Sequence, residues 1–192
     1  RLACHRLEIP FYVLDYQQEF RETVINYFIE GYSSGNTPNP CVMCNKKIKS
    51  SLLLKKATEL DCEHLATGHY ARICSNPDTG STQLSRPQDL RKDQTYFLHG
   101  IPSGDLPRLM FPLSELTKTE VRKIARKLKL STADKPDSQE VCFVPKDYRK
   151  FLKNELNETP LPGEFTSISG EVLGEHKGLP YYTIGQRRGL GL

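Results

Sequence analysis

The chain has 192 residues and a net charge of +4 at pH 7, and 37% of its residues are hydrophobic. Nine tyrosines and eight phenylalanines supply bulk for a core, which excludes disorder over most of the length. No stretch approaches the ~20 apolar residues that cross a bilayer, and no cationic start precedes an apolar export signal. We therefore expect a cytoplasmic protein without a membrane partner.

Two elements are expected before the first pair of cysteines. Residues 10–15 are mostly apolar and predict a short buried strand. Residues 20–28 predict a helix that places Val24, Tyr27 and Phe28 on one side.

The next segment alternates between the patterns of helix and strand. Residues 45–60 predict a helix, and residues 64–71 predict a strand that ends in a loop. A helix followed by a strand, repeated, favours a parallel sheet, so we predict the α/β class. The apolar face of the helix is expected to consist of Ile48, Leu52, Leu53, Ala57 and Leu60.

A polar stretch and a capped helix follow. Residues 75–93 predict an exposed excursion, and Asp93 is expected to cap a short helix that includes Leu98. Thr117 and Glu120 have the spacing of a capping box, which predicts the start of a helix. Its buried stripe is expected to consist of Val121, Ile124, Ala125 and Leu128.

The pattern changes again near residue 145. A helix around residues 148–156 precedes segments punctuated by glycine and proline, which predict strands. We therefore expect two domains, an α/β domain at residues 1–144 and the start of a small, mostly β domain at residues 145–192.

Cys41 and Cys44 directly follow the rigid sequence Asn-Thr-Pro-Asn-Pro at residues 36–40. Proline fixes its own φ and favours extended geometry in the residue before it, so a helix can begin after this loop. A thiol in the first helical turn lies at the positive end of the helix dipole, near several lysines, which favours the thiolate. Zinc is the weaker interpretation because no second pair of cysteines or histidines follows at finger spacing, and we expect no metal.

Three polar motifs are candidates for ligand binding. Gly68 and His69 end a predicted strand, where open parallel sheets bind ligands, although a tight turn would have the same sequence. Residues 92–94, Lys-Asp-Gln, suit a phosphate and a base edge, or simply begin a helix. Residues 181–191 combine aromatic, arginine and glycine residues, which suits RNA, but an ordinary β-hairpin remains open.

The clusters of basic residues and Cys142 each have two interpretations. Lysines and arginines crowd residues 46–56 and 118–129, which favours a polyanionic partner such as nucleic acid, although solvated helix faces look the same. Cys142 lies in an apolar stretch, where a buried, inert cysteine is the usual interpretation.

Five segments taken together resemble the tRNA-specific 2-thiouridylases. They are TPNPCVMCNK at residues 37–46, ATGHYA at 66–71, KDQTYFL at 92–98, DSQEVCF at 137–143 and YTIGQR at 182–187. The resemblance runs in order across essentially the whole chain. It implies a Rossmann-like, PP-loop domain of the adenine-nucleotide alpha-hydrolase type, with a parallel sheet, followed by a central tRNA-binding domain.

The resemblance also implies a reaction, which is ATP-dependent and Mg-dependent 2-thiolation of the wobble uridine of tRNA. In that family, ATP adenylates the 2-oxygen of the uracil, and sulfur then replaces it. Cys142 resembles the persulfide intermediate, which a cysteine desulfurase or a sulfur-relay protein loads. Cys44 resembles the nucleophile that attacks the persulfide or closes a transient disulfide with Cys142.

Further roles follow from the same resemblance. Gly68 corresponds to a position that binds ATP. Positions that contact the tRNA or its target base correspond to Asn39, Pro40, Cys41, His69, Lys92, Asp93 and Gln94.

The sequence differs from the family in two respects. It lacks the family's Ser-Gly-Gly-x-Asp-Ser phosphate-binding loop and the C-terminal β-barrel domain, so we expect an internal fragment that is inactive alone. Cys41 stands where some members carry an acid, so Cys41, Cys44 and Cys142 could instead hold a [4Fe-4S] cluster. Two other classes stay open, namely a non-catalytic RNA-binding module and a zinc-stabilised domain.

Overall fold

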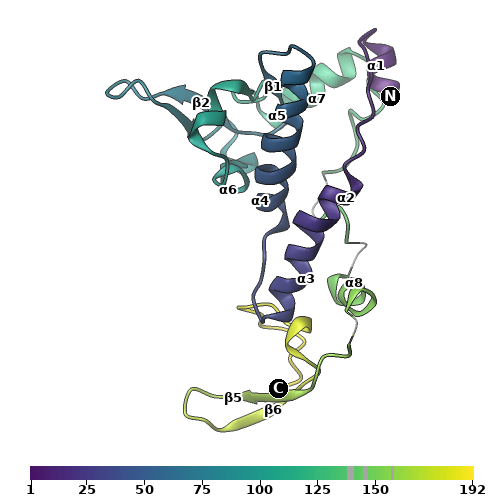
Figure 1. The fold of residues 1–192 in the computed structure, drawn as a ribbon, viewed down its shortest axis with the longest axis vertical. Helices are drawn as coiled ribbons and strands as arrows, with labels where there is room; N and C mark the ends of the chain where they lie inside the picture. The colour runs from purple at the N-terminus through teal and green to yellow at the C-terminus, as the bar shows by residue number, and fades with distance from the viewer. Residues whose placement is uncertain (138–140, 145–146, 157) are drawn as a thin grey trace. The chain divides into compact units, whose positions relative to one another are not determined.

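A computed structural model describes residues 1–137, 141–144, 147–156 and 158–192, which form a mixed α/β fold (Figure 1). The chain divides into two compact units, each made of two segments. The first unit comprises Arg1–Glu19 and Cys41–Asp137, and the second comprises Phe20–Pro40 and Ser138–Leu192.

Two chain segments form long, nearly continuous helices (Figure 1). The first consists of α2 (Gln17–Phe20), the π-helical η1 (Arg21–Ile25) and α3 (Asn26–Ser33). The second consists of α4 (Pro40–Cys44), the π-helical η2 (Asn45–Leu52) and α5 (Leu53–Glu59). The remaining helices of the first unit are α1 (Leu2–Arg6), η3 (Leu90–Lys92), α6 (Thr95–Leu98), η4 (Ser103–Arg108) and α7 (Lys118–Lys127).

The first unit contains one parallel and one antiparallel strand pair. Strand β1 (Leu65–Ala66) pairs in parallel with β4 (Leu109–Met110), so the predicted parallel pairing is present, over two residues of each strand. Strands β2 (Arg72–Ser75) and β3 (Thr82–Ser85) form an antiparallel hairpin. The core beside them is formed by Leu54, Ala71, Leu98, Leu106, Leu109 and Phe111.

The helix predicted for residues 45–60 is confirmed, but its buried face differs from the predicted one. Ile48 and Ala57 are buried as expected, whereas Leu60 is 48% exposed and Leu54 enters the core instead. The π-helical turns of η2 explain the difference, because a wider turn shifts the face that a 3.6-residue period predicts.

The second unit packs aromatic side chains around α3. Phe28, Tyr32, Val144 and Leu152 form its core, and the ring of Phe28 meets that of Phe143 edge to face at 5.4 Å. The predicted helix after residue 147 is confirmed as α8 (Tyr148–Glu155). The antiparallel strands β5 (Gly163–Thr166) and β6 (Val172–His176) follow it, then the short helix η5 (Leu179–Tyr181).

Three sequence predictions about local structure are wrong. Residues 10–15 are exposed and form no strand, because no described strand pairs with them. Residues 182–191 form turns and irregular chain after the short helix that ends at Tyr181, so the hairpin alternative is excluded there. On α7, Ile124 and Leu128 are 45% and 43% exposed, because its apolar stripe is not buried by the described residues. By contrast, the exposed excursion predicted for residues 75–93 is confirmed, because most of these residues are exposed, and it includes β3, which pairs with β2.

Candidate functional site

Both ring nitrogens of His69 have polar partners within the first unit. Its Nδ1 lies 2.8 Å from Thr67 Oγ1, and its Nε2 lies 3.4 Å from Lys49 Nζ. An ammonium group only donates, so Nε2 accepts and the proton sits on Nδ1, which donates to the Thr67 hydroxyl. The imidazole is therefore neutral, with one fixed tautomer.

The surroundings of His69 keep it neutral well below pH 7. Burial, and secondly the positive charge of Lys49, lower the pKa of His69 to about 4. The ring also meets Phe111 edge to face at 6.1 Å. A small pocket is lined by Asn45, Lys49, Ser50, Leu65, Thr67, His69, Leu98, Ile101, Leu109 and Phe111.

The Lys92-Asp93-Gln94 motif is tied to the loop that carries His69. The main-chain N–H of Tyr70 donates to Gln94 Oε1, and the main-chain N–H of Gln94 donates to the Tyr70 carbonyl, both at 2.9 Å. Asp93 accepts from the main-chain N–H and the hydroxyl of Thr95, at 2.9 and 2.6 Å, but the N-cap of α6 is Gln94, one residue after the predicted cap. Two motifs that the sequence singled out separately therefore share one surface.

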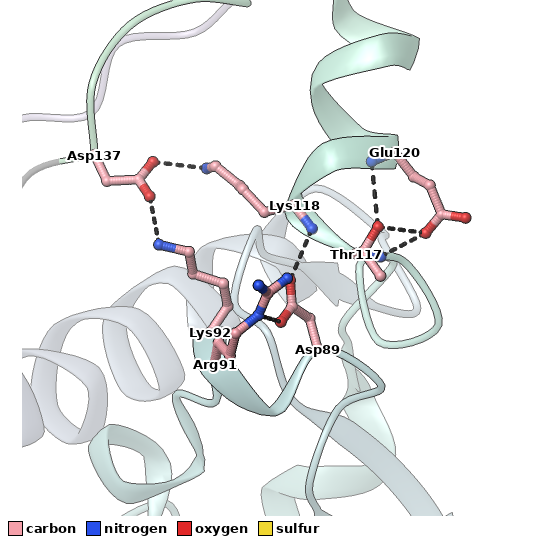
Figure 2. Close-up of polar contacts among 7 residues, drawn as sticks. All are labelled: Asp89, Arg91, Lys92, Thr117, Lys118, Glu120 and Asp137. Carbon is pink, nitrogen blue, oxygen red and sulfur yellow. Dashed lines mark hydrogen bonds and ion pairs between the residues drawn. The ribbon is translucent and has the colours of Figure 1, made fainter.

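Lys92 contacts a third motif through an ion pair. Its Nζ lies 2.8 Å from Asp137 Oδ2, and Lys118 Nζ lies 2.9 Å from Asp137 Oδ1 (Figure 2). The hydrogen bonds from Lys92 and then Lys118 lower the pKa of Asp137 to about 2. Sequence reasoning missed this cluster because its members are far apart in the chain.

The start of α7 holds one of these lysines in place. The predicted capping box is confirmed, with Glu120 accepting from the main chain and hydroxyl of Thr117 (Figure 2). The buried carboxylate of Asp89 accepts from the main-chain N–H of Lys118 at 3.0 Å. That hydrogen bond lowers the pKa of Asp89.

The Cys-x-x-Cys pair lies on the helix that the proline-rich loop was expected to precede. Pro40 is the first residue of α4, Cys41 is exposed and Cys44 is half-buried. No disulfide bond occurs within the described part of the chain. The described residues also contain no group of three or more His, Cys, Asp or Glu side chains able to hold a metal ion.

Cys142 belongs to the second unit and is exposed, so the expectation of a buried cysteine is wrong. It lies just after residues 138–140, which fall outside the described residues. The predicted meeting of Cys44 with Cys142, by disulfide or through a cluster, stays a prediction.

Gly68 leaves open space on its surface. A Cβ atom built on it would meet no atom within 4 Å, so a ligand can approach this backbone without obstruction. The residue is exposed, at the loop that follows β1.

The loop before α4 is anchored within the second unit. Thr37 Oγ1 accepts from the main-chain N–H of Ile184 at 3.1 Å. Pro38 packs so closely on Gly31 that a Cβ there would come within 2.7 Å of the proline ring. Thr37 and Pro38 therefore fix the position of the chain just before Asn39 and Pro40. Thr37 also attaches this loop to the motif at residues 182–187, which contains Ile184.

The second unit also contains a basic cavity of about 510 Å³ that sequence reasoning missed. It lies between α8 and the segment around Tyr181 and Tyr182, and Arg149 Nε donates to the Tyr181 carbonyl at 2.7 Å. Two signals are present in the sequence. Arg149 and Lys153 are spaced i, i+4 on one helix, and part of the lining belongs to residues 181–191, which the sequence singled out for RNA. The lining consists of Arg149, Lys150, Lys153, Glu175, Lys177, Tyr181, Tyr182, Gly189, Leu190 and Gly191.

None of the helices formed by the described residues combines the length and the apolar character that crossing a membrane requires.

Comparison with known proteins gives a consistent result. Residues 1–146 match the tRNA methyl transferase HUP domain family, and residues 149–192 match the tRNA methyl transferase PRC-barrel domain family. The chain is 54% identical to the tRNA-specific 2-thiouridylase MnmA of Carboxydothermus hydrogenoformans, over 100% of the chain and 53% of the relative. The proteins of the same name from Symbiobacterium thermophilum and Chloroflexus aurantiacus are 50% and 51% identical, again over 100% of the chain, and 50% and 54% of their own lengths. The chain thus spans about half the length of these relatives.

Proposed function

Because the chain belongs to the tRNA-specific 2-thiouridylase family, we propose that it takes part in ATP-dependent 2-thiolation of the wobble uridine of tRNA. The observation that carries the proposal is the 54% identity along the whole chain, which includes all five motifs of the sequence. The attachment of the His69 loop to the Lys92-Asp93-Gln94 motif is consistent with the proposal, because the resemblance implies tRNA contacts for both motifs.

Two thiols carry the sulfur in this proposal. A cysteine desulfurase or a sulfur-relay protein loads Cys142 with a terminal sulfur, and the exposure of Cys142 suits that transfer. The Cys44 thiolate attacks Cys142 Sγ, the persulfide bond breaks, and the terminal sulfur leaves as sulfide while the two cysteines form a disulfide. Sulfide then replaces the adenylated 2-oxygen at C2, and AMP leaves. An external dithiol then reduces the disulfide. To form that disulfide, the Cα atoms of Cys44 and Cys142 must come to about 4.4–6.8 Å from each other.

ATP, with Mg, supplies the adenylyl group that turns the 2-oxygen into a leaving group. The residue proposed to approach it is Gly68, and the open space at that glycine fits a nucleotide passing close to the main chain. In this proposal, the loop at Gly68 lies beside the nucleotide. Among the described residues, no glycine-rich loop is proposed to hold the phosphates of ATP.

The tRNA is proposed to contact residues of both units. Asn39 and Pro40 of the second unit and Cys41 of the first would border the target base, which must leave its stack before C2 is reachable. Neutral His69 and Lys92-Asp93-Gln94 of the first unit would contact the RNA. In the second unit, the basic cavity offers four cations against one carboxylate, together with two tyrosines, which suits phosphates and bases. We keep the domain boundary near residue 145 as part of this proposal.

Mass spectrometry of nucleosides tests the function. The full-length protein, incubated with unmodified tRNA, ATP and a persulfide donor, should form 2-thiouridine. Cys44→Ser and Cys142→Ser should each abolish the product, whereas Cys62→Ser, at another exposed cysteine, should not. Full activity of both serine variants would favour a non-catalytic RNA-binding role.

The iron-sulfur alternative needs a separate measurement. Iron and acid-labile sulfide are quantified after anaerobic purification, together with activity. A stoichiometric cluster that activity requires would replace the persulfide route, and its ligands would then be Cys41, Cys44 and Cys142. Activity in metal-free protein, with a persulfide on Cys142, supports the route proposed above.

A further inference from the structure

Asp137 is the last residue of the first unit, and both of its carboxylate oxygens are occupied. Lys92 Nζ lies 2.8 Å from Oδ2, and Lys118 Nζ lies 2.9 Å from Oδ1 (Figure 2). An Arg122 guanidinium nitrogen lies 3.8 Å from Oδ1. The hydrogen bonds from Lys92 and then Lys118 lower the pKa of Asp137 to about 2, so its carboxylate stays ionised to a lower pH than an ordinary aspartate. The ion pairs that attach Asp137 to the first unit therefore persist across the whole physiological pH range.

The two ammonium groups come from elements that one buried residue connects. The carboxylate of Asp89 accepts from the main-chain N–H of Lys118 at 3.0 Å. The main-chain carbonyl of Asp89 accepts from the main-chain N–H of Lys92 at 2.9 Å. Asp89 is 5% exposed. Two ammonium groups therefore meet one carboxylate, and such a network of charges contributes more to stability than an isolated surface ion pair.

Cys142 follows this anchor by five positions in the chain. A fully extended chain spans at most ~3.6 Å per residue, so Cys142 Cα stays within roughly 18 Å of Asp137 Cα. Phe143 and Val144, which follow Cys142, pack in the core of the second unit, so the ion pairs of Asp137 restrain the segment from its first-unit end. We propose that Asp137 is a positioning residue that tethers the Cys142 segment to the first unit through Lys92 and Lys118.

The charges of the cluster separate this role from RNA binding. Lys92, Lys118 and Arg122 outnumber the single carboxylate, so removing Asp137 makes the surface more positive and cannot weaken its attraction for phosphate. A tether therefore predicts slower sulfur transfer with tRNA affinity unchanged or increased. A carboxylate that only masked cations would give faster transfer when removed.

A distance measurement tests the tether without reference to catalysis. Spin labels on Cys62 and Cys142, with the other cysteines replaced by serine, report the separation by double electron–electron resonance in the full-length protein. Cys62 is a fixed reference because its carbonyl accepts from Arg108 at 3.2 Å. Asp137→Ala and Lys118→Met should widen the distance distribution, and Asp137→Glu should restore most of it. A distribution unchanged in both disrupting variants overturns the proposal.

Single-turnover thiolation tests the consequence, and this part rests on the proposed function. Asp137→Ala should lower the rate at least fivefold with a tRNA Kd no higher than that of the parent protein, and Asp137→Glu should recover most of the rate. Asp134→Ala is the matched control. Asp134 pairs with Arg126 of α7, the helix that also carries Lys118, but Asp134 is not the residue from which the Cys142 segment begins. An unchanged or increased rate, or a Kd that rises as the rate falls, overturns the proposal. If the parent protein forms no 2-thiouridine while the distances still widen, the proposed function fails and the tether stands.

Discussion

The side chain of Gln94 accepts from the main-chain N–H of Tyr70 at 2.9 Å, while the main-chain N–H of Gln94 donates to the Tyr70 carbonyl. These two hydrogen bonds join the loop that carries His69 to the Lys92-Asp93-Gln94 motif. Tyr70 is 4% exposed, so water cannot readily replace a missing partner there. The pair therefore fixes the relative positions of residues that are both proposed to contact the tRNA.

We expect Gln94→Leu to lower the free energy of unfolding by about 1–3 kcal/mol, because the buried N–H of Tyr70 would lose its acceptor. Urea denaturation measures the change. Gln83→Leu, on the exposed side of β3, is the control and should stay within about 0.5 kcal/mol. Equal effects of the two variants would mean that the Tyr70 hydrogen bond contributes nothing specific.

The sequence predicted some of these relationships and not others, for physical reasons. The Thr117–Glu120 capping box is local, so its spacing alone predicted the start of α7. The hydrogen bond between Lys92 and Asp137 joins residues 45 positions apart, and no local pattern encodes such a meeting. The apolar residues 10–15 predicted a strand, but a strand also requires a partner, which the described residues do not provide. The residues of the candidate site could be predicted from the resemblance. Their ion pairs and pKa shifts could not, because these depend on contacts that only the folded chain makes.

His69 makes stability depend on pH in a defined window. Its pKa is about 4 in the folded protein and 6.5 when unperturbed, so between these values the unfolded chain binds more protons. Stability should therefore fall as the pH drops from 6.5 towards 4, by on the order of 2 kcal/mol, and recover as the pH rises. Denaturation midpoints across this range measure it. His69→Gln should flatten the profile, whereas His64→Gln, at an exposed histidine, should leave it unchanged.

Gly68 offers a clean test of nucleotide binding. A new Cβ would touch no protein atom within 4 Å, so Gly68→Val should leave stability within about 1 kcal/mol of the parent. If ATP passes close to this backbone, the same change should raise the KM for ATP at least tenfold in full-length protein. Gly104→Val, where a Cβ is equally unobstructed, is the matched control and should leave the KM unchanged. An unaltered KM in Gly68→Val would remove Gly68 from the proposed ATP site.

The basic cavity of the second unit should contribute electrostatically to tRNA binding. Lys150 and Lys153 both line it, and each lysine that neutralises a phosphate adds ~0.7–0.9 to the dependence of log Kd on log salt. The double variant Lys150→Ala/Lys153→Ala should therefore raise the Kd for tRNA and lower the salt slope by about 1.5, as measured by fluorescence anisotropy across salt concentrations. Lys135→Ala, at an exposed lysine of the first unit outside the cavity, controls for net charge and should change the slope by less than about 0.5. A double variant with the slope of the parent protein would show that the cavity does not bind the RNA backbone.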